Sequence, residues 1–475
     1  MFKKILLILL TIVLITTAIT GCNPSTGPIS SSSSSLESQE PEDVTPSPVT
    51  ITIGNWPKAD DEAGLATYNA YLSKMNELYP YITIEKDEWG YDVNSFLAKA
   101  AGGNLPTLYD TYFTEIDKII SAGYAADLTS AMTKYGYIEG LNKDLLALAS
   151  DGNKYYALPH SGYYVGLMVN IPLFEEAGLM KDGLPLYPAT LDELVERAKT
   201  IKAKTGKPGF FFPTKSNQGG WMFMNIAWSY GAEFEKQVNG KWEAVFNSNE
   251  AVDALKYIRD LKWVHNVLPE NNLVDVNDLA GMFGTDQVGM AFGLQDWAYL
   301  LVNMVGMNKD NMAMVPVPGG KSGSTPVMGG GAYVVAPNAT AEQIDAVFKW
   351  LGVIGYTPDT NQNELDGLNL RLKDMNEAGN LVLPPALKIW SQKERVDAED
   401  AIYEEYVNVD RTLWNDYLDK GGEGMRPEVP INAQELYQIL DGVIQEVLTN
   451  KDADLKALLD AAVSNFQSNY LDNAQ

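Results

Sequence analysis

The sequence is poor in the residues that build disulfides and many metal sites. Its 475 residues include one cysteine, Cys22, and two histidines, His160 and His265. One cysteine cannot form an intrachain disulfide, and two histidines without a usable thiol make a histidine-based zinc site implausible. Stability must therefore come from buried apolar surface. A chain of this length with 45% hydrophobic residues can supply that surface, and two domains are the natural expectation.

The signatures of several common enzyme classes are also missing. The sequence contains no GxSxG, HExxH or phosphate-cradling P-loop, and a Ser-His-Asp triad would need one of the two histidines. A stretch beginning at Asp359 resembles the start of a calcium loop, but the glycine and distal glutamate of an EF-hand are absent at the required spacing. We therefore expect no cofactor, no metal and no catalytic residue.

Positive charge is scarce as well. The chain carries 35 lysines and arginines against 62 aspartates and glutamates, a formal net charge of −27. Such a surface repels nucleic acid and anionic lipid headgroups, so nucleic acid is excluded as a partner. The excess of acidic residues is typical of a soluble secreted protein and argues against a strongly anionic ligand.

The N-terminus has the layout of a secretory signal. Lys3 and Lys4 precede an apolar stretch at residues 5–19, which is shorter than the roughly 20 residues of a spanning helix. The segment Ile19-Thr20-Gly21-Cys22 then resembles a bacterial lipobox, in which small residues precede a cysteine that becomes the lipid-bearing N-terminus. We expect residues 1–22 to be a lipoprotein signal peptide ending at lipidated Cys22. The protein would then be anchored at the extracellular face of the cytoplasmic membrane; an uncleaved N-terminal anchor is the alternative.

Residues 23–49 have a low-complexity composition with a serine run at Ser30–Ser35. Because this stretch has almost nothing apolar to bury, it predicts a disordered Ser/Pro-rich tether. A flexible chain of this length reaches roughly 30 Å, using about 5–6 Å times the square root of the residue number. The folded part would therefore lie close to the membrane.

From residue 50 onward, strand and helix patterns alternate. The predicted elements are strands at 50–53, 82–84 and 107–111, helices at 67–79, 93–101 and 115–122, and later strands at 313–317 and 332–335. This alternation indicates a mostly parallel α/β sheet. From about Tyr187 the pattern becomes largely helical, and Thr190 with Glu193 three residues later predicts a helix start with a capping box.

Several short stretches form a recognisable series along the chain. They are Asp151–Pro159, Leu167–Asn170 with Phe174 and Gly178, Pro188–Leu194, Phe283–Ala291, Gly293–Trp297, Val315–Pro318, Met328–Gly331, Ala346–Leu351 and Arg426–Pro430. Each piece is weak alone, but their order and spacing together resemble the family 1 extracellular solute-binding proteins, the sugar receptors of ATP-driven (ABC) importers. The resemblance covers essentially all of residues 49–475, with an unusual stretch at 356–385.

The resemblance implies an α/β, two-lobe fold like that of periplasmic binding proteins, with a ligand cleft between the lobes. We expect residues 50–161 and 332–390 to form lobe 1, and residues 162–331 and 391–475 to form lobe 2. The chain would cross near 160–164, near 329–332 and near 390, with Gly162 and Gly329–Gly331 suited to hinges. The expected partners are a carbohydrate ligand and the permease subunits of an ABC transporter, and we expect a monomer.

The ligand site is predicted from sugar chemistry. Sugars present apolar faces and a rim of hydroxyls, so a site needs flat aromatic rings and planar polar groups, placed at loops that follow strands. The predicted ligand-binding residues are Trp56, Trp89, Tyr91, Tyr112, Phe113, Glu115, Tyr163, Tyr164, Asn217, Gln218, Trp221, Gln295, Asp296, Trp297 and Gly330. By the resemblance, the positions matching Tyr112, Glu115, Tyr163 and Trp297 commonly contact sugar in relatives.

Each residue also has a structural interpretation. Trp56 and Trp89 could close the edge of the core, one of Tyr112 and Phe113 must face away from the cleft, and Glu115 could simply cap a helix. Two alternatives to a sugar receptor stay open: a secreted carbohydrate-active enzyme with a carboxylate pair, and a receptor for a peptide or polyamine. The aromatic content favours an oligosaccharide over a monosaccharide.

Overall fold

The computed structural model describes residues 46–360 and 362–473. The predicted signal peptide, Cys22 and nearly all of the predicted tether lie outside the described residues. Strand β1 begins at Val49, one residue before the predicted strand and inside the stretch assigned to the tether. Among the residues described, we find no helix with both the length and the apolar character that a bilayer span requires.

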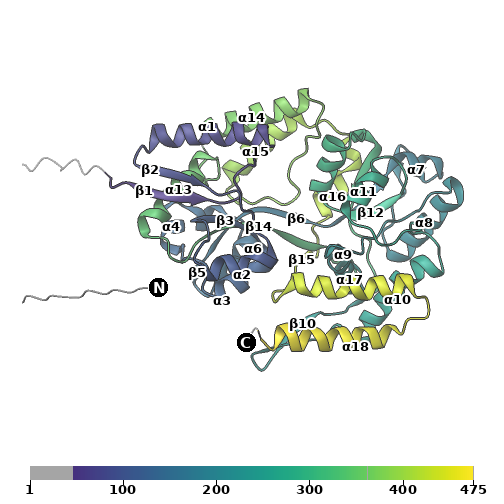
Figure 1. Ribbon diagram of the computed structural model, residues 1–475. Coiled ribbons are helices and arrows are strands. Elements are labelled where there is room, and N and C mark those ends of the chain that lie inside the picture. Colours follow the sequence, from purple (N-terminus) through teal and green to yellow (C-terminus); the bar gives the residue numbers. More distant parts are fainter. Residues whose placement is uncertain (1–45, 361, 474–475) are drawn as a thin grey trace, which may run out of the picture. The chain divides into compact units, whose positions relative to one another are not determined.

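The first sheet belongs to the first lobe and has the order β15–β14–β3–β1–β2, with β6 also paired to β14 (Figure 1). Its strands are β1 (Val49–Ile53), β2 (Ile82–Lys86), β3 (Leu108–Tyr112), β6 (Ala157–Tyr164), β14 (Val327–Val335) and β15 (Arg426–Pro427). Strand β1 is parallel to β2 and β3, which confirms the parallel arrangement predicted for the N-terminal strands. Strand β14 is antiparallel to both β3 and β6.

Helices cover both faces of this sheet because its strands are apolar on both sides. They are α1 (Glu62–Leu78), α2 (Val93–Ala101), α3 (Phe113–Ser121), α4 (Thr129–Lys134), α5 (Tyr137–Gly140), α6 (Lys143–Ala147) and α13 (Ala341–Val353). Neighbouring strand residues point into different cores: Leu108 packs in a core with Trp350 of α13, and Tyr109 packs in a second core with Phe96 of α2. This period of two is the geometry of a strand buried on both faces.

The second lobe is built around a smaller sheet and one large core. Strands β7 (Gly166–Asn170), β12 (Met290–Gly293) and β13 (Met312–Val315) form an antiparallel sheet in the order β12–β7–β13, and all their residues are buried. The surrounding helices are α7 (Ile171–Glu176), α8 (Leu191–Thr205), α9 (Gln218–Tyr230), α10 (Asn249–Trp263), α11 (Val276–Phe283), α12 (Gln295–Tyr299), α16 (Asn415–Lys420), α17 (Ala433–Thr449) and α18 (Leu455–Phe466). A hairpin of β10 (Glu235–Val238) and β11 (Lys241–Ala244) lies beside α18.

The predicted start of α8 is confirmed in part. The hydroxyl of Thr190 accepts the backbone N–H of Glu193 at 3.2 Å, as an N-cap residue should. The carboxylate of Glu193 accepts the N–H of Ala189 at 2.8 Å, one residue before the partner of a standard capping box. The helix end is therefore satisfied by both side chains, with the second bond shifted by one residue.

Two paired strands, β6 and β14, run between the two lobes (Figure 1). β6 continues through Val165 directly into β7 of the second sheet, and the pairing of β6 with β14 shifts register between Gly331 and Ala332. The glycines predicted as hinges lie in this ribbon, where the structure gives them a packing reason. A Cβ on Gly330 would lie 2.2 Å from the carbonyl oxygen of Ser161, so only glycine lets the strands approach this closely.

The chain between residues 356 and 410 passes repeatedly between the two cores. Tyr356 and Trp390 belong to the core beneath α13, whereas Leu381 and Leu383 belong to the core of the second lobe. Two helices of this segment, α14 (Gln362–Glu377) and α15 (Lys393–Tyr406), pack against each other near α1 (Figure 1). The lobe boundary at residue 390 stays a prediction, because the segment contributes to both cores.

Candidate functional site

A cavity of about 520 Å³ opens between the two lobes beside the β6–β14 ribbon. The first lobe and the ribbon contribute Asn55, Gly90, Tyr91, Asp110, Thr111, Tyr112, His160, Ser161, Tyr163, Gly330 and Gly331. The second lobe contributes Ser216, Asn217, Gln218, Trp221, Leu294 and Asp296, and the C-terminal region adds Glu428, Gln434 and Tyr437. We call this cavity the interlobe cleft. Its volume lies within the range of roughly 300–1,000 Å³ that is usual for small-molecule sites.

The first-lobe residues reach the cleft because parallel strands end there. Asn55 follows β1, Tyr91 follows β2, and Tyr112 is the last residue of β3. Asn55 adopts a left-handed backbone with φ of 53°, and its N–H donates to the carbonyl of Trp89 at 2.8 Å. This bond ties the ends of β1 and β2 together and turns Asn55 toward the cavity.

Behind these residues lies a buried carboxylate. The hydroxyl of Tyr91 donates to Glu115 at 2.8 Å, and the Tyr91 and Tyr112 rings meet edge to face at 5.7 Å. The side chain of Glu115 is fully buried, and this desolvation raises its pKa although the ammonium group of Lys118 lies 3.7 Å away. Glu115 thus positions Tyr91 and does not line the cleft.

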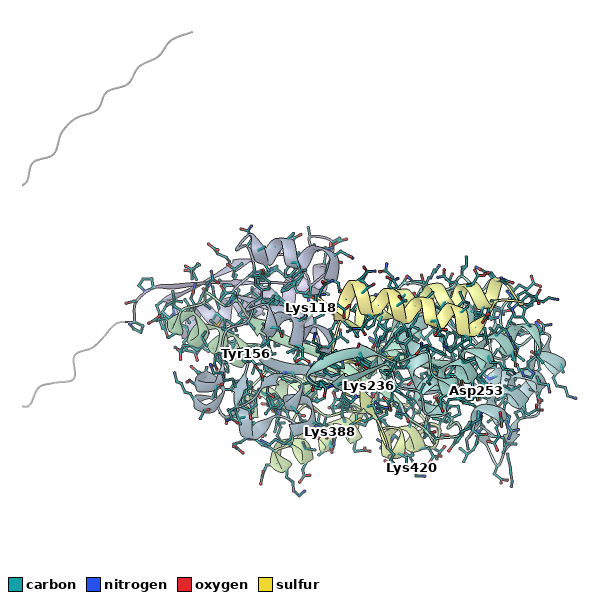
Figure 2. All side chains as sticks on the ribbon, turned by 90° about the horizontal axis from the view of Figure 1, so that it is seen from below. Lys118, Tyr156, Lys236, Asp253, Lys388 and Lys420 are labelled. Atoms are coloured by element: carbon teal, nitrogen blue, oxygen red, sulfur yellow. The ribbon has the colours of Figure 1, made fainter. Side chains whose placement is uncertain are left out.

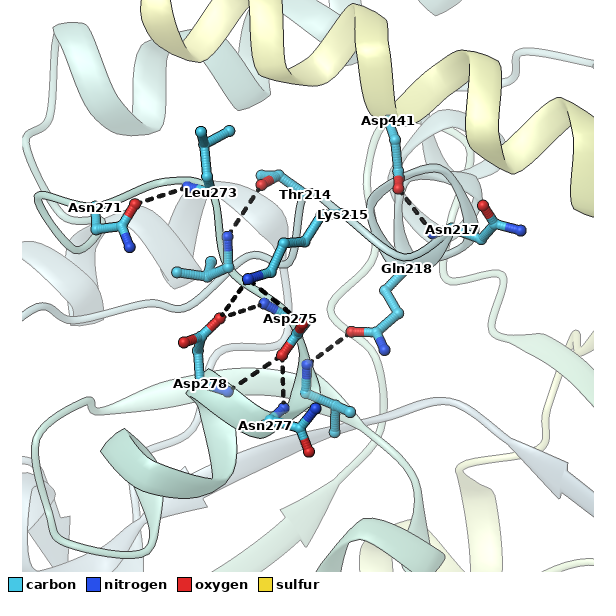
Figure 3. Close-up of polar contacts among 12 residues, drawn as sticks. Thr214, Lys215, Asn217, Gln218, Asn271, Leu273, Asp275, Asn277, Asp278 and Asp441 are labelled. Atoms are coloured by element: carbon cyan, nitrogen blue, oxygen red, sulfur yellow. Dashed lines mark hydrogen bonds and ion pairs between the residues drawn. The ribbon is translucent and has the colours of Figure 1, made fainter.

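On the second lobe, a strained loop at residues 214–218 presents polar groups (Figure 3). Ser216 and Asn217 both have positive φ, at 62° and 67°, which costs energy for residues other than glycine. Asp441 of α17 compensates by accepting the N–H groups of Asn217 and Gly220, each at 2.8 Å. Burial raises the pKa of Asp441 to about 6, despite these bonds.

Two further contacts fix the same loop from its other side (Figure 3). Lys215 lies 3.4 Å from Asp275 and 3.2 Å from Asp278, and Gln218 accepts the N–H of Val276 at 2.7 Å. Asp275 and Asp278 also form the capping box of α11. Because the loop is bonded to both α11 and α17, its side chains are held in place before any ligand arrives.

An aromatic group forms the apolar wall of the cleft. Trp221 meets Tyr163 edge to face at 5.8 Å and Trp297 at 6.1 Å. The indole N–H of Trp221 is buried and has no hydrogen-bond partner among the described residues. The part of Trp221 that lines the cleft is therefore not this N–H group.

The floor of the cleft carries two carboxylates with raised pKa values. Glu428, which follows β15, accepts the Tyr437 hydroxyl at 2.9 Å, and burial raises the pKa of Glu428 to about 7. Desolvation also raises the pKa of Asp296 at the start of α12. On the ribbon, His160 Nε2 lies 2.7 Å from Asp110 Oδ1. These groups can accept and donate hydrogen bonds around a hydroxyl-rich ligand.

Most of the predicted ligand residues are brought together. Those that line the cleft are Tyr91, Tyr112, Tyr163, Asn217, Gln218, Trp221, Asp296 and Gly330. Two more lie one layer behind the cleft: Glu115 supports Tyr91, and Trp297 supports Trp221. Their role as ligand-binding residues stays a prediction.

The structure does not place the other five predicted residues at the cleft wall. Trp56 is in the core between Tyr68 and Trp350, with ring centres 4.9 and 5.9 Å away. Trp89 packs against Tyr109 and lies beneath Lys99, and Phe113 lies under Gly330 in the same core. Tyr164 donates its hydroxyl to the carbonyl of Tyr417 at 2.9 Å, and Gln295 binds the backbone at Pro384 and Ala386. These side chains serve packing or backbone anchoring.

The predicted list of ligand-binding residues left out several residues of the cleft. They are Asn55, Gly90, Asp110, Thr111, His160, Ser161, Ser216, Leu294, Gly331, Glu428, Gln434 and Tyr437. Asn55, Asp110 and Ser216 are near predicted residues, and a wider selection after each strand would have included them. Nothing local marks Glu428, Gln434 or Tyr437, because a long-range return of the chain brings them to the first lobe.

No group of three or more His, Cys, Asp or Glu residues within 46–360 and 362–473 is arranged to hold a metal ion. The cleft itself is lined by aromatic, amide and carboxylate side chains. Their combination of aromatic rings, amides and carboxylates can bind a neutral polar solute through stacking and hydrogen bonds.

Comparison with known protein families identifies the class. Residues 59–354 match the family of bacterial extracellular solute-binding proteins, and the chain belongs to this family. The predicted family is confirmed, and its members are binding proteins of ABC importers rather than enzymes. Membership implies a location outside the cytoplasm and a partnership with an ABC transporter.

Solved structures show the same two-lobe fold at low sequence identity. The cyclic α-maltosyl-1,6-maltose binding protein of Arthrobacter globiformis is 20% identical, with a TM-score of 0.63 over 89% of this chain and 98% of that chain. The Listeria monocytogenes protein Lmo0181, in complex with cycloalternan, is 18% identical, with a TM-score of 0.64 over 89% of this chain and 98% of that chain. UgpB of Mycobacterium tuberculosis, in complex with glycerophosphocholine, is 14% identical, with a TM-score of 0.60 over 89% of this chain and 98% of that chain. The two-lobe α/β fold predicted from the sequence is confirmed.

Proposed function

We propose that this protein captures a carbohydrate, specifically an oligosaccharide, in the interlobe cleft and delivers it to the permease of an ABC importer. The observation that carries this proposal is the composition of the cleft. Trp221, Tyr163 and Tyr112 offer aromatic faces, while Asn217, Asp296 and other planar polar groups surround them. Apolar C–H faces and a rim of hydroxyls require this combination.

Two of the similar structures support the ligand class. The Arthrobacter protein binds cyclic α-maltosyl-1,6-maltose, the Listeria protein is in complex with cycloalternan, and both share the fold of this chain. UgpB is in complex with glycerophosphocholine, and proteins generally bind phosphate groups through arginine or lysine. The cleft is lined by Asp110, Asp296 and Glu428 but by no lysine or arginine among the described residues, so a neutral sugar fits better.

The proposed mechanism is capture without chemistry. Ligand that contacts both lobes shifts the protein toward the arrangement in which the lobes are closed around it. The β6–β14 ribbon joins the lobes, and the closed form would dock on the permease through both of them. The protein would act as a monomer held to the membrane by a lipid on Cys22, with residues 23–49 as the tether.

Calorimetry and small-angle scattering on the purified full chain test the proposal. We expect micromolar or tighter binding of at least one oligosaccharide, about −8 kcal/mol or better, and a smaller radius of gyration in the complex. Chromatography of the same mixtures must show no new products. A thermal-shift screen in which peptides or polyamines bind and no sugar does would contradict the proposed ligand class.

The lipid anchor needs its own experiment. Cells expressing the chain would be fed an alkyne-labelled fatty acid, and the label should appear on the wild type and be lost in Cys22→Ala. The variant should also leave the membrane fraction or retain its uncleaved signal. A labelled Cys22→Ala protein would refute lipidation at this residue.

A further inference from the structure

A second and larger cavity adjoins the interlobe cleft. Its volume is about 1310 Å³, against about 520 Å³ for the cleft itself. The two cavities share the lining residues His160, Ser161 and Asp296, so they meet at the β6–β14 ribbon and the start of α12. The second cavity extends from there between α1, the turn after α13, and helices α14 and α15. We call it the α14–α15 compartment.

Its outer wall lies beyond the part of the chain that the family match covers. The match ends at residue 354, and α14 begins at Gln362. Helix α15 is fixed in place by Arg395, whose guanidinium lies over the ring of Trp390 at 4.3 Å and donates to Glu399 at 2.8 Å. Arg395 is itself buried, so this wall is built into the fold.

The lining of the compartment resembles that of the cleft in its aromatic rings but differs from it in carrying cationic side chains. Rings of Tyr71, Tyr333 and Tyr403 face it, and Trp390 contributes at its base. Charges of both signs line the compartment. Lys74 and Arg371 contribute positive charge, and Asp374 and Asp400 contribute negative charge. In a chain with a net charge of −27, this mixture fits an uncharged, hydroxyl-rich ligand better than a strongly charged one.

The combined volume is too large for a monosaccharide or disaccharide to fill. Ligand pockets are usually about 300–1,000 Å³, and the compartment alone exceeds that range. A ligand that occupied only the cleft would leave the aromatic rings of the compartment exposed to water. A longer chain of sugar units could pass His160 and Asp296 and cover both sets of rings.

We propose that the bound carbohydrate extends from the interlobe cleft past His160 and Asp296 into the α14–α15 compartment, so that the protein selects long oligosaccharides over short ones. This inference rests on the proposed function, since it requires a carbohydrate in the cleft. It adds the length of the ligand and assigns α14 and α15 to its recognition.

Two glycines allow the compartment to be filled without disturbing its wall. Gly367 of α14 and Gly352 of α13 both line it, and a Cβ at either position would meet no atom within 4 Å. Leucine is a better helix former than glycine, so Gly367→Leu should fold and place a large side chain in the cavity. The matched control is Gly281→Leu on α11, which has the same open surroundings and lines none of the cavities described here.

The experiment offers ligand-stripped full chain to partial hydrolysates of starch, cellulose, xylan and mannan, and reads the bound sugar by native mass spectrometry. The wild type and Gly281→Leu should retain the longer oligosaccharides of one of these hydrolysates. Gly367→Leu should shift the bound distribution to shorter members. By calorimetry it should bind the longest bound sugar at least tenfold more weakly while keeping its affinity for the disaccharide.

Three results would overturn the inference. If the wild type binds the disaccharide as tightly as the longer sugars, or if Gly367→Leu leaves the distribution unchanged, the compartment is not used, and the proposed function still stands. If no sugar from any of the hydrolysates binds the wild type, the proposed function is wrong and this inference is wrong with it. Should Gly367→Leu not fold, as judged by circular dichroism, Gly352→Leu replaces it with the same expected shift.

Discussion

Lys118 of α3 and Glu435 of α17 form an ion pair of 2.8 Å that joins the first lobe to the second. The same ammonium group lies 3.7 Å from the buried Glu115, and Figure 2 shows Lys118 beside the yellow helices of the C-terminal region. Thr114 and Gln434 add a hydrogen bond of 3.3 Å between the same two helices. One cation, shared by a carboxylate of each lobe, is thus part of the contact between the lobes.

Removing that cation should loosen the contact between the lobes. In Lys118→Met, Glu115 and Glu435 lose their common partner, so we expect a loss of about 1–3 kcal/mol, between the values for exposed and buried pairs. Small-angle scattering should show a larger radius of gyration for the ligand-free variant, and ligand should bind more weakly. Lys99→Met is the control, because Lys99 and Asp87 form a pair of similar exposure within the first lobe. If Lys118→Met and Lys99→Met had the same radius of gyration and the same ligand affinity, the Lys118–Glu435 ion pair would not hold the lobes together.

Trp221 should carry a large share of the ligand affinity. Trp221→Ala removes the aromatic wall of the cleft, and we expect binding at least about tenfold weaker, or roughly 1.4 kcal/mol. Trp221→Phe keeps an aromatic face without the donor and should lose only a few-fold. Calorimetry with the bound sugar measures both, and Trp263→Ala on the exposed face of α10 serves as the control. An unchanged affinity in Trp221→Ala would remove this residue from the site.

Asp441 should affect binding without lining the cleft. Asp441→Ala takes away the acceptor for two N–H groups of the 214–220 segment, and hydrogen bonds to charged groups contribute about 1.5–3 kcal/mol. We expect a lower melting temperature and weaker ligand binding, with Asp441→Asn intermediate because its amide keeps one acceptor oxygen. Asp460→Ala on α18, a charged position exposed to solvent, should change neither. If Asp441→Ala lowers stability alone, the loop does not depend on this anchor for binding.

Stability should fall as pH rises from about 5 to 8. Burial raises the pKa of Glu235 to about 8 and that of Glu428 to about 7, so the folded state holds these protons more tightly than the unfolded chain. Between the ordinary carboxyl pKa and these raised values, the folded state binds more protons and loses stability as pH increases. Thermal melts across this range should show the slope, and Glu235→Gln should flatten it. Glu233→Gln is the matched control, since Glu233 forms an exposed ion pair with Arg426.

Local signals in the sequence predicted the first-lobe elements well. Helix α2 spans the predicted residues 93–101, because Asp92 caps its start and two glycines follow its end. Helix α1 begins at Glu62 instead of the predicted residue 67, because Asp61 accepts the N–H of Gly64 and starts the helix earlier. Boundaries set by one side-chain cap are easy to overlook when the apolar spacing is the guide.

The composition of the cleft was harder to predict, because it depends on tertiary contacts. Asn55 and Trp56 are neighbours in sequence, yet Asn55 lines the cleft and Trp56 packs under α13. Only the positions of α1 and α13 decide which of the two is buried. Glu428 and Tyr437 lie more than 300 residues along the chain from Tyr112, which lines the same cleft, and no pattern near them indicates this contact.

The position of β14 has a consequence for how the protein is made. This strand lies between β3 and β6 in the first sheet, but it comes from residues 327–335, far along the chain. The sheet of the N-terminal strands is therefore incomplete until most of the polypeptide has been synthesised. Strand pairings this distant in sequence also form slowly. Until residues 327–335 arrive, the edges of β3 and β6 stay unpaired, and unpaired strand edges are the parts of a folding chain most prone to aggregation.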